Sequence, residues 1–350
     1  MKRKKRKVVS STLPTGFLER LAMFVSPSVF REMEKLFVER PTTLRTNGIK
    51  VKKHESMKAI LGEFGFKTRK VDWYKDAMIL ENRTKRDLTE TKPYEEGKIY
   101  IQSLASMVPP LILDPKPGEK VLDLTAAPGS KTSQMAMMME KTGELVANDN
   151  NKVRFFKLKH NMELLGVVGD ADTPHHSGGQ ASPTSPLNGE GGLSSDWKFV
   201  LRMEHGAKLC REYPEYFDKI LLDAPCSAEA RFVLGNPKTF GYWSERKIKE
   251  MAYKQRQLLL AAWGALKPGG VLVYSTCTMA PEENEVQISR LLERNPDAEI
   301  ENIAIPGLKV VPPVLTWKEK ALHSGVKKSL RIMPTKEVEG FFVAKIRKRK

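Results

Sequence analysis

Short apolar runs and segments with helical spacing alternate along most of the chain after residue 119. The apolar runs have the length of buried strands, and between them apolar residues recur at intervals of three and four, which predicts amphipathic helices. The predicted strands are 121–124, 144–148, 199–203, 219–223 and 270–275, and the predicted helices are 130–140, 152–165 and 245–266. Strands that alternate with helices in this way predict an α/β fold with a parallel, doubly wound sheet.

The pattern before residue 96 is less regular. It predicts two short helices within 13–39, a strand and turn over 43–50, a helix over 57–64 and strands within 67–81. These elements combine apolar faces with Lys and Arg. We therefore expect a small α+β domain over 13–95, followed by a large domain over 96–350.

Two segments carry no apolar pattern. Residues 1–12 include the basic run KRKKRK, and residues 167–197 are rich in Gly, Ser, Pro and Thr. Segments of this composition bury too little apolar surface to fold. We expect a disordered basic tail and a disordered insertion between a helix and the next strand.

One strand-turn-helix, residues 120–132, has the form of a ligand site. A buried strand carries Asp123 near its carboxyl end, the turn Ala126-Ala127-Pro128-Gly129 follows, and a helix begins at Ser130. Small residues let a ligand approach the backbone, and a helix start offers free amide donors. Ligands of such sheets bind beyond the carboxyl ends of the strands, where Asp149 can hold ribose hydroxyls. On this pattern alone, a turn without a ligand and a solvated Asp149 remain open alternatives.

The composition limits the kinds of partner and compartment that we expect for the chain. Its net charge of +17 suits a polyanion such as nucleic acid, although a lysine-rich solvated surface gives the same value. Three Cys are too few for a disulfide framework and favour a reducing compartment. No apolar run is long enough to span a bilayer, and no cluster has metal-ligand spacing, so we expect neither a membrane nor a metal.

Two of the three cysteines follow buried strands that should end at the same edge of the sheet. Cys226 comes shortly after Asp223, and Cys277 comes shortly after the strand 270–275. Cys210, by contrast, fits the role of a small buried hydrophobe.

Cysteine and carboxylate together suit the methylation of a pyrimidine at carbon 5. A thiolate that adds to carbon 6 activates carbon 5 toward a methyl donor and leaves when carbon 5 loses its proton. A carboxylic acid such as Asp223 can hydrogen-bond the ring as charge develops on it. This chemistry alone does not choose between Cys226 and Cys277 as the nucleophile.

Six stretches of the sequence resemble the Nol/Nop/Sun (Fmu) family of S-adenosylmethionine-dependent RNA cytosine-5 methyltransferases. They are LRTNGIK (44–50), GKIYIQSLASMVPP (97–110), DLTAAPGSKT (123–132), DKILLDAPCS (218–227), YSTCTMAPEENE (274–285) and RIMPTKEVEGFFVAKIRK (331–348). The resemblance implies a Rossmann-like class I methyltransferase fold. It also implies S-adenosylmethionine as cofactor and a cytosine of tRNA or rRNA as substrate.

The resemblance further implies roles for single residues. Cys277 would be the nucleophile, Cys226 would assist product release, Asp223 would contact the base, and Lys131 would position cofactor and substrate. The implied cofactor-binding set is Thr125, Ala126, Ala127, Pro128, Gly129, Ser130, Lys131, Asp149, Arg154, His205 and Asp223. In the small domain, we expect Arg45, Asn47 and Lys50 to face the RNA.

Three stretches depart from the family pattern. His205 in Glu204-His205-Gly206 stands where the family usually has an Asp on the adenine side of the cofactor. Gln102-Ser103 replaces Gln-Asp, and Ala228-Glu229-Ala230 replaces Gly-Glu-Gly. Because both thiols are retained together with their neighbouring carboxylate and lysine, we expect an active enzyme.

Two other functions are compatible with parts of the sequence. An amino-group methyltransferase usually carries Pro-Pro-Tyr where this chain has Asp-Ala-Pro-Cys over 223–226. An RNA-binding ribosome assembly factor with weakened catalysis fits the basic surface and His205, but not two retained cysteines. We expect a monomer in the cytoplasm, or in the nucleus or nucleolus of a eukaryotic cell.

Overall fold

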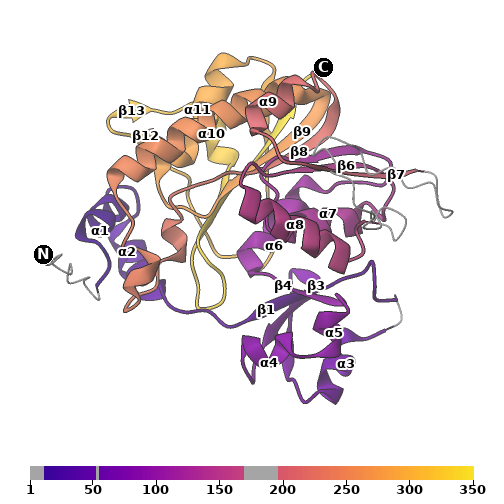
Figure 1. The fold of residues 1–350 in the computed structure, drawn as a ribbon. Coiled ribbons are helices and arrows are strands. Elements are labelled where there is room, and N and C mark those ends of the chain that lie inside the picture. The colour runs from indigo at the N-terminus through magenta and orange to yellow at the C-terminus, as the bar shows by residue number, and fades with distance from the viewer. Residues whose placement is uncertain (1–11, 53–54, 169–195) are drawn as a thin grey trace, which may run out of the picture.

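The computed structural model describes residues 12–52, 55–168 and 196–350. Almost all of the predicted tail and insertion therefore lies outside the described residues. A large sheet has helices on both faces, and a smaller sheet packs beside one of these helix layers (Figure 1).

Five parallel strands form the centre of the large sheet, in the order β9-β8-β5-β6-β7. Each corresponds to a predicted strand, and the predicted Rossmann-like, doubly wound α/β fold is confirmed. The chain proceeds outward from β5 first on one side and then on the other. Sheets of this kind bind ligands in a crevice at the carboxyl ends of the strands on either side of the reversal, here β5 and β8. The bounds are β5 (Lys120–Asp123), β6 (Gly143–Asn148), β7 (Trp197–Arg202), β8 (Phe217–Asp223) and β9 (Leu266–Thr276).

An antiparallel extension continues the sheet beyond β9, and the sequence pattern did not predict it. The strand β15 (Phe341–Lys348) pairs with β9, and β14 (Leu330–Ile332) pairs with β15. Phe342 lies opposite Thr276, and Phe341 lies opposite Ile332, so these ends share one edge. The remaining strands of this region are β10 (Ala298–Glu301), β11 (Val310–Val311) and the hairpin of β12 (Thr316–Trp317) and β13 (Lys320–Ala321).

Strand residues alternate between two helix layers, as the period of two in a pleated strand requires. In β9, Val271 and Val273 contribute to the core beneath one layer, whereas Leu272 and Tyr274 contribute to the other. The first layer contains α6 (Leu104–Leu113), α7 (Ser130–Met138) and α8 (Lys152–Leu164), and the second contains α9 (Gly206–Arg211), α10 (Glu245–Ala265) and α11 (Glu285–Arg294).

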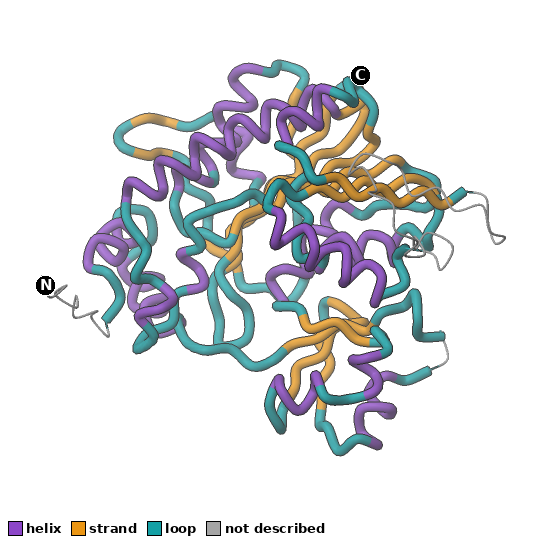
Figure 2. The backbone as a smooth tube through the Cα atoms, in the orientation of Figure 1, coloured by secondary structure: helices purple, strands orange, loops and turns teal. Residues whose placement is uncertain are grey.

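The small sheet has four antiparallel strands in the order β2-β3-β1-β4. One face, with Tyr74, Ala77 and Ile79, joins the core shared with α6, and the other face, with Met78 and Leu80, packs against short helices. Figure 2 shows these helices on the side away from the large sheet. The bounds are β1 (Thr43–Thr46), β2 (Thr68–Val71), β3 (Tyr74–Leu80), β4 (Ile99–Ile101), α3 (Met57–Glu63), α4 (Lys85–Thr89) and α5 (Lys92–Glu95).

The first two helices, α1 (Thr15–Ala22) and α2 (Pro27–Met33), pack away from the small sheet. Phe17 and Phe37 share a core with Phe232, Met279 and Met333 of the large domain. The sequence analysis grouped these helices with the small domain over 13–95, because apolar spacing identifies a helix but not the surface that it covers. Within the described residues, no helix combines the length and the apolar composition needed to cross a bilayer.

Candidate active site

The two cysteines predicted at strand ends meet at the carboxyl edge of β8 and β9. These strands are parallel neighbours, with Asp223 opposite Ser275, so the loops that follow them emerge side by side. The Sγ atoms of Cys226 and Cys277 lie 3.3 Å apart, and both thiols are half-buried. Cys210 is buried elsewhere, on the face of α9 that packs against the core, as its apolar role requires.

The environment differs between the two thiols. The hydrogen bond from Cys226, aided by the positive charge of Arg231, lowers the pKa of Cys277 to about 7. The same hydrogen bond raises the pKa of Cys226, and burial adds to this shift. Of the two thiols, Cys277 therefore loses its proton more readily, and Cys226 then serves as the hydrogen-bond donor.

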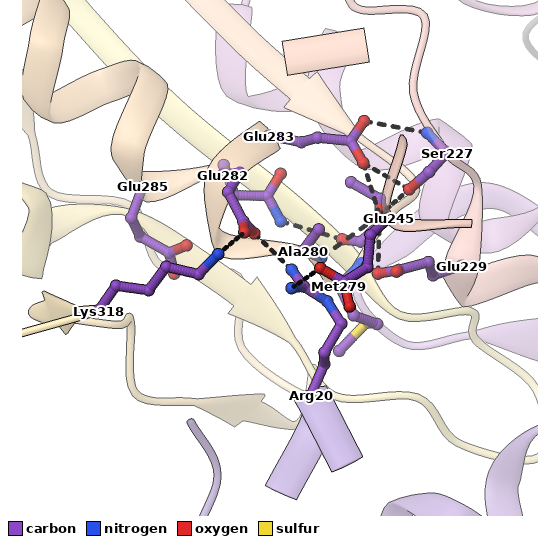
Figure 3. A network of polar contacts seen from close by, with 12 residues as sticks. Arg20, Ser227, Glu229, Glu245, Met279, Ala280, Glu282, Glu283, Glu285 and Lys318 are labelled. Atoms are coloured by element: carbon purple, nitrogen blue, oxygen red, sulfur yellow. Dashed lines mark hydrogen bonds and ion pairs between the residues drawn. The ribbon is translucent and has the colours of Figure 1, made fainter. Parts of the chain in front are cut away.

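A buried polar network joins the two cysteine loops (Figure 3). The residues that follow the cysteines, Ser227 and Thr278, are hydrogen-bonded through their hydroxyls at 2.7 Å. Glu283 receives the backbone N–H of Ser227 at 3.0 Å and the side chain of Gln255 at 2.8 Å. Thr278 donates to Glu229 at 3.0 Å. These contacts hold one loop against the other and thereby set the separation of the thiols.

Glu283 is buried at the centre of this network, and burial raises its pKa to about 8. A neutral carboxyl can donate to Ser227 through one oxygen and accept both N–H donors on the other. The chain of hydroxyls then continues through Thr278 to Glu229. With the protons in this order, the hydroxyls of Ser227 and Thr278 each donate to an acceptor, as buried polar groups require.

Lys131 and Asp223 form an ion pair beside the thiols. The Lys131 ammonium lies 2.7 Å from Asp223, with side-chain exposures of 9% and 27%. It also donates to Ser106 of α6 at 2.6 Å, while Ser275 donates to the second Asp223 oxygen at 2.8 Å. Lys131 lies one residue into α7, so the small-residue turn positions it. The pair presents one cation and one carboxylate to the crevice.

The turn from Thr125 to Ser130 forms the base of the crevice next to this pair. Thr125 donates to the Asp223 carbonyl at 2.8 Å, and Ala126 donates its N–H to the Asn148 carbonyl at 2.7 Å. Gly129 has φ of 104°, and a Cβ there would lie 2.5 Å from Met162 of α8. Glycine therefore allows α8 to pack directly against the turn.

Asp149, directly after β6, and Arg154, in the first turn of α8, hold this turn in place. Asp149 receives the N–H of Ala127 at 3.3 Å, and Arg154 donates to the Ala127 carbonyl at 2.6 Å. Arg154 also pairs with Asp149 at 3.1 Å, so the structure uses Arg154 to anchor the loop. His205 is exposed at the start of α9, where its side chain faces solvent.

The crevice contains groups that suit a ligand with hydrogen-bond donors. Asp123 accepts from Thr132 at 2.7 Å through one oxygen, while its other oxygen is buried without a partner in the described structure. Burial raises the pKa of Asp123 to about 7. An unpaired buried oxygen beside a small-residue turn, with a carboxylate at the end of the next strand, fits a nucleoside cofactor that carries amino and ribose groups.

The structure does not support RNA contact by Arg45 and Asn47. Both side chains are fully buried: Arg45 donates to Ser133 at 2.8 Å, and Asn47 donates to the carbonyls of Gly97 and Leu165 at 2.8 and 2.9 Å. They connect the small sheet to α7 and α8, because the strand that carries them packs against the large domain. Lys50 is exposed and donates to the Glu96 carbonyl at 3.0 Å.

Two charged residues near Cys277 were missed by the sequence interpretation. Arg231 lies in the turn after Cys226, where Ala230 donates its N–H to the Cys277 carbonyl at 3.2 Å. The negative charge of Cys277 is the main cause of the raised pKa of Arg231, and Glu339 contributes to it. Arg231 directly follows the Ala228-Glu229-Ala230 run that stood out in the sequence, and a basic residue so close to Cys226 was an available signal.

A parallel sheet with a small-residue turn after its first strand, a carboxylate after its second and two adjacent thiols after its fourth and fifth is consistent with a Rossmann-like methyltransferase. The family model described as 16S rRNA methyltransferase RsmB/F matches residues 110–181 and 197–347. The chain belongs to this family, and the resemblance to the Nol/Nop/Sun methyltransferases is confirmed, together with the prediction that the chain is an enzyme.

Relatives with known names agree with this assignment. The chain is 37% identical over 310 residues to the tRNA (cytosine(49)-C(5))-methyltransferase of Pyrococcus abyssi, with 88% of each chain aligned. It is 33% identical to the ribosomal RNA small subunit methyltransferase F of Pectobacterium atrosepticum, over 98% of this chain and 64% of that protein. The chain thus spans less than two thirds of this bacterial relative.

Solved structures share the fold. A methyltransferase homologue from Pyrococcus horikoshii superposes with a TM-score of 0.75 at 30% identity, covering 97% of this chain and 96% of the other. NSun6 from Pyrococcus horikoshii superposes with a TM-score of 0.74 at 22% identity, over 97% and 99% of the two chains.

Proposed function

We propose that the chain transfers a methyl group from S-adenosylmethionine to carbon 5 of a cytosine in tRNA or rRNA. The observation that carries this proposal is the pair of thiols 3.3 Å apart, beside an ion pair of Lys131 and Asp223. Relatives named for tRNA and for rRNA are both found, and the tRNA enzyme aligns over most of both chains. A tRNA cytosine is therefore the first substrate to test.

Cys277 is the proposed nucleophile because its lowered pKa makes it the thiol of the pair that ionises more readily. Its sulfur forms a bond to carbon 6 of the cytosine, and the electron pair of the 5,6 double bond moves into the ring. Lys131 lies where its ammonium can stabilise the developing charge or donate a proton to the ring. Asp223, held by Lys131 and Ser275, can accept a hydrogen bond from the base amino group.

The bound cofactor supplies the electrophilic methyl group. We propose that the backbone from Thr125 to Ser130 borders it and that Asp149 accepts from its ribose, with Arg154 keeping that loop in place. Asp123 would accept a hydrogen bond from the amino group of the cofactor through its unpaired oxygen. His205 lies exposed at the start of α9, and its place on the adenine side stays a prediction from the resemblance.

Release requires that carbon 5 lose its proton. We propose that a water molecule accepts this proton and that Cys226, which keeps its own proton, assists by donating a hydrogen bond to the Cys277 sulfur as it leaves. The carbon 5 electron pair then restores the 5,6 double bond and expels the Cys277 thiolate. The contact of 3.3 Å between the two sulfurs supports this role, because Cys226 would stay close to the sulfur that leaves.

The test is transfer of tritium from labelled S-adenosylmethionine to tRNA and, separately, to rRNA transcripts, with nucleoside analysis. The wild type should produce 5-methylcytidine in one pool. Cys277→Ala should abolish transfer without loss of cofactor binding, and Cys226→Ala should accumulate a protein–RNA adduct that survives denaturation. Cofactor and RNA binding without transfer to either pool would instead favour the assembly factor on the same fold.

A further inference from the structure

A cavity of about 350 Å³ lies between the small sheet and the last strands of the large sheet. Its lining comes from residues 69–73 at the β2–β3 connection, from Leu104 at the start of α6, and from 307–309 and 332–338. The volume falls at the lower end of the roughly 300–1,000 Å³ of small-ligand sites. The cavity therefore suits one nucleotide-sized group rather than a folded partner.

Two elements connect the wall of the cavity to the candidate active site. Ile332, in its wall, lies opposite Phe341, and the next residue of β15 lies opposite Thr276, which precedes Cys277. On the other side, Leu104 lies two residues before Ser106, which receives the hydrogen bond from Lys131. The cavity and the candidate active site are therefore connected through neighbouring strands and through α6.

Trp73 gives the cavity a flat apolar wall. Its side chain is half-buried, and its ring stacks on that of Tyr74, with centroids 6.3 Å apart and planes at 18°. Gly307 lies beside the indole edge, where an added Cβ would be 3.8 Å from it. A planar base can stack on such a surface whatever its identity, because every base has a π-face.

The charged part of the lining is predominantly basic. Four cations, Arg69, Lys70, Lys309 and Lys336, face two carboxylates, Asp72 and Glu337. Arg69 pairs with Glu81 and Glu337, and Lys309 pairs with Glu32 at 3.2 Å. Lys70 and Lys336 are exposed and form no ion pair with any residue that the structure describes. These two ammonium groups are available to phosphates.

We propose that this cavity binds the RNA nucleotide adjacent to the target cytosine, with its base on Trp73 and its phosphates beside Lys70 and Lys336. This inference rests on the proposed function. A cytosine that enters the catalytic crevice must leave its stack, so its neighbours lose a stacking partner. The Trp73 wall replaces that partner, and the two lysines hold the strand as it leaves the site.

The test uses a fluorescein-labelled single-stranded RNA oligonucleotide with one central cytosine, bound to the full chain and followed by anisotropy. Trp73→Leu should weaken binding by at least about fivefold, the lower range for loss of one base–aromatic stack. Trp73→Phe should restore most of it. Lys70→Gln and Lys336→Gln should each lower the slope of log affinity against log salt by about 0.7. Lys58→Gln, the same change on α3 at the far face of the small sheet, is the matched control.

Several outcomes separate this inference from the proposed function. Methyl transfer by the variants should show a raised KM for RNA with an unchanged KM for the cofactor. If Trp73→Leu binds like the wild type, or Trp73→Phe binds as weakly as Trp73→Leu, the stacking wall is refuted. If the wild type transfers no methyl group, the proposed function fails. The oligonucleotide measurement still tests the cavity, because it requires no turnover.

Discussion

Removing Cys226 should make Cys277 harder to ionise. Cys226 donates a hydrogen bond to the Cys277 thiolate across 3.3 Å, and this bond is the main reason that the pKa of Cys277 lies at about 7. Hydrogen bonds to charged groups contribute about 1.5–3 kcal/mol. Each pH unit corresponds to about 1.4 kcal/mol. Because both thiols are half-buried, water replaces part of the lost bond, and we expect Cys226→Ala to move the titration midpoint of Cys277 upward by about one pH unit.

Alkylation with iodoacetamide measures this midpoint, since only the thiolate reacts. Rates are followed for each cysteine by peptide mass spectrometry between about pH 5 and 10. Cys210→Ala is the matched control: burial raises the pKa of Cys210 to about 12, so its removal should leave the profile unchanged. Arg231→Met should also raise the midpoint, whereas Arg231→Lys should not.

Two results would refute this reasoning. If Cys226 rather than Cys277 reacts at pH 7, the assignment of the thiolate is wrong. If the Cys277 midpoint stays in place in Cys226→Ala, the contact between the sulfurs does not control its ionisation. The methyl-transfer rate of the wild type should follow the same profile and rise with pH through about 7.

Two further predictions concern buried carboxyl groups. Burial raises the pKa of Glu283 to about 8, so the folded state keeps a proton that the unfolded chain loses near pH 4.3, and stability should fall as pH rises between these values. Glu283→Gln should flatten this dependence in urea denaturation at several pH values, and an unchanged slope would mean that Glu283 is charged. Arg331→Met should destabilise the fold by about 3–5 kcal/mol, because it leaves the buried Glu285 carboxylate without its partner. The double change Arg331→Met with Glu285→Met should recover most of the loss in the same assay, and a single variant as stable as the wild type would contradict the pairing.

The local pattern of apolar residues was sufficient to predict the parallel strands and the long helices of the large domain. The predicted strand 219–223 corresponds to β8, and the predicted helix 245–266 corresponds to α10, because continuous apolar runs and helical spacing are properties of neighbouring residues. The antiparallel strand β15 was not predicted. Its pairing with β9 joins residues about seventy positions apart, and no local pattern specifies such a partner.

The sequence by itself determined the chemistry available at the sheet edge. A thiol after each of two strands, a carboxylate at Asp223 and a small-residue turn before Lys131 follow from residue type and order, since parallel neighbouring strands end at a common edge.

Only the tertiary structure decided how these groups and the cations are used. The fold buries Arg45 between the small sheet and α7, and it brings Arg231 and Glu339 near Cys277. It also brings the two sulfurs within 3.3 Å, and the hydrogen bond between them gives the two thiols different pKa values. The physical reason is that exposure and ionisation depend on what packs over a side chain, and those neighbours come from distant parts of the chain.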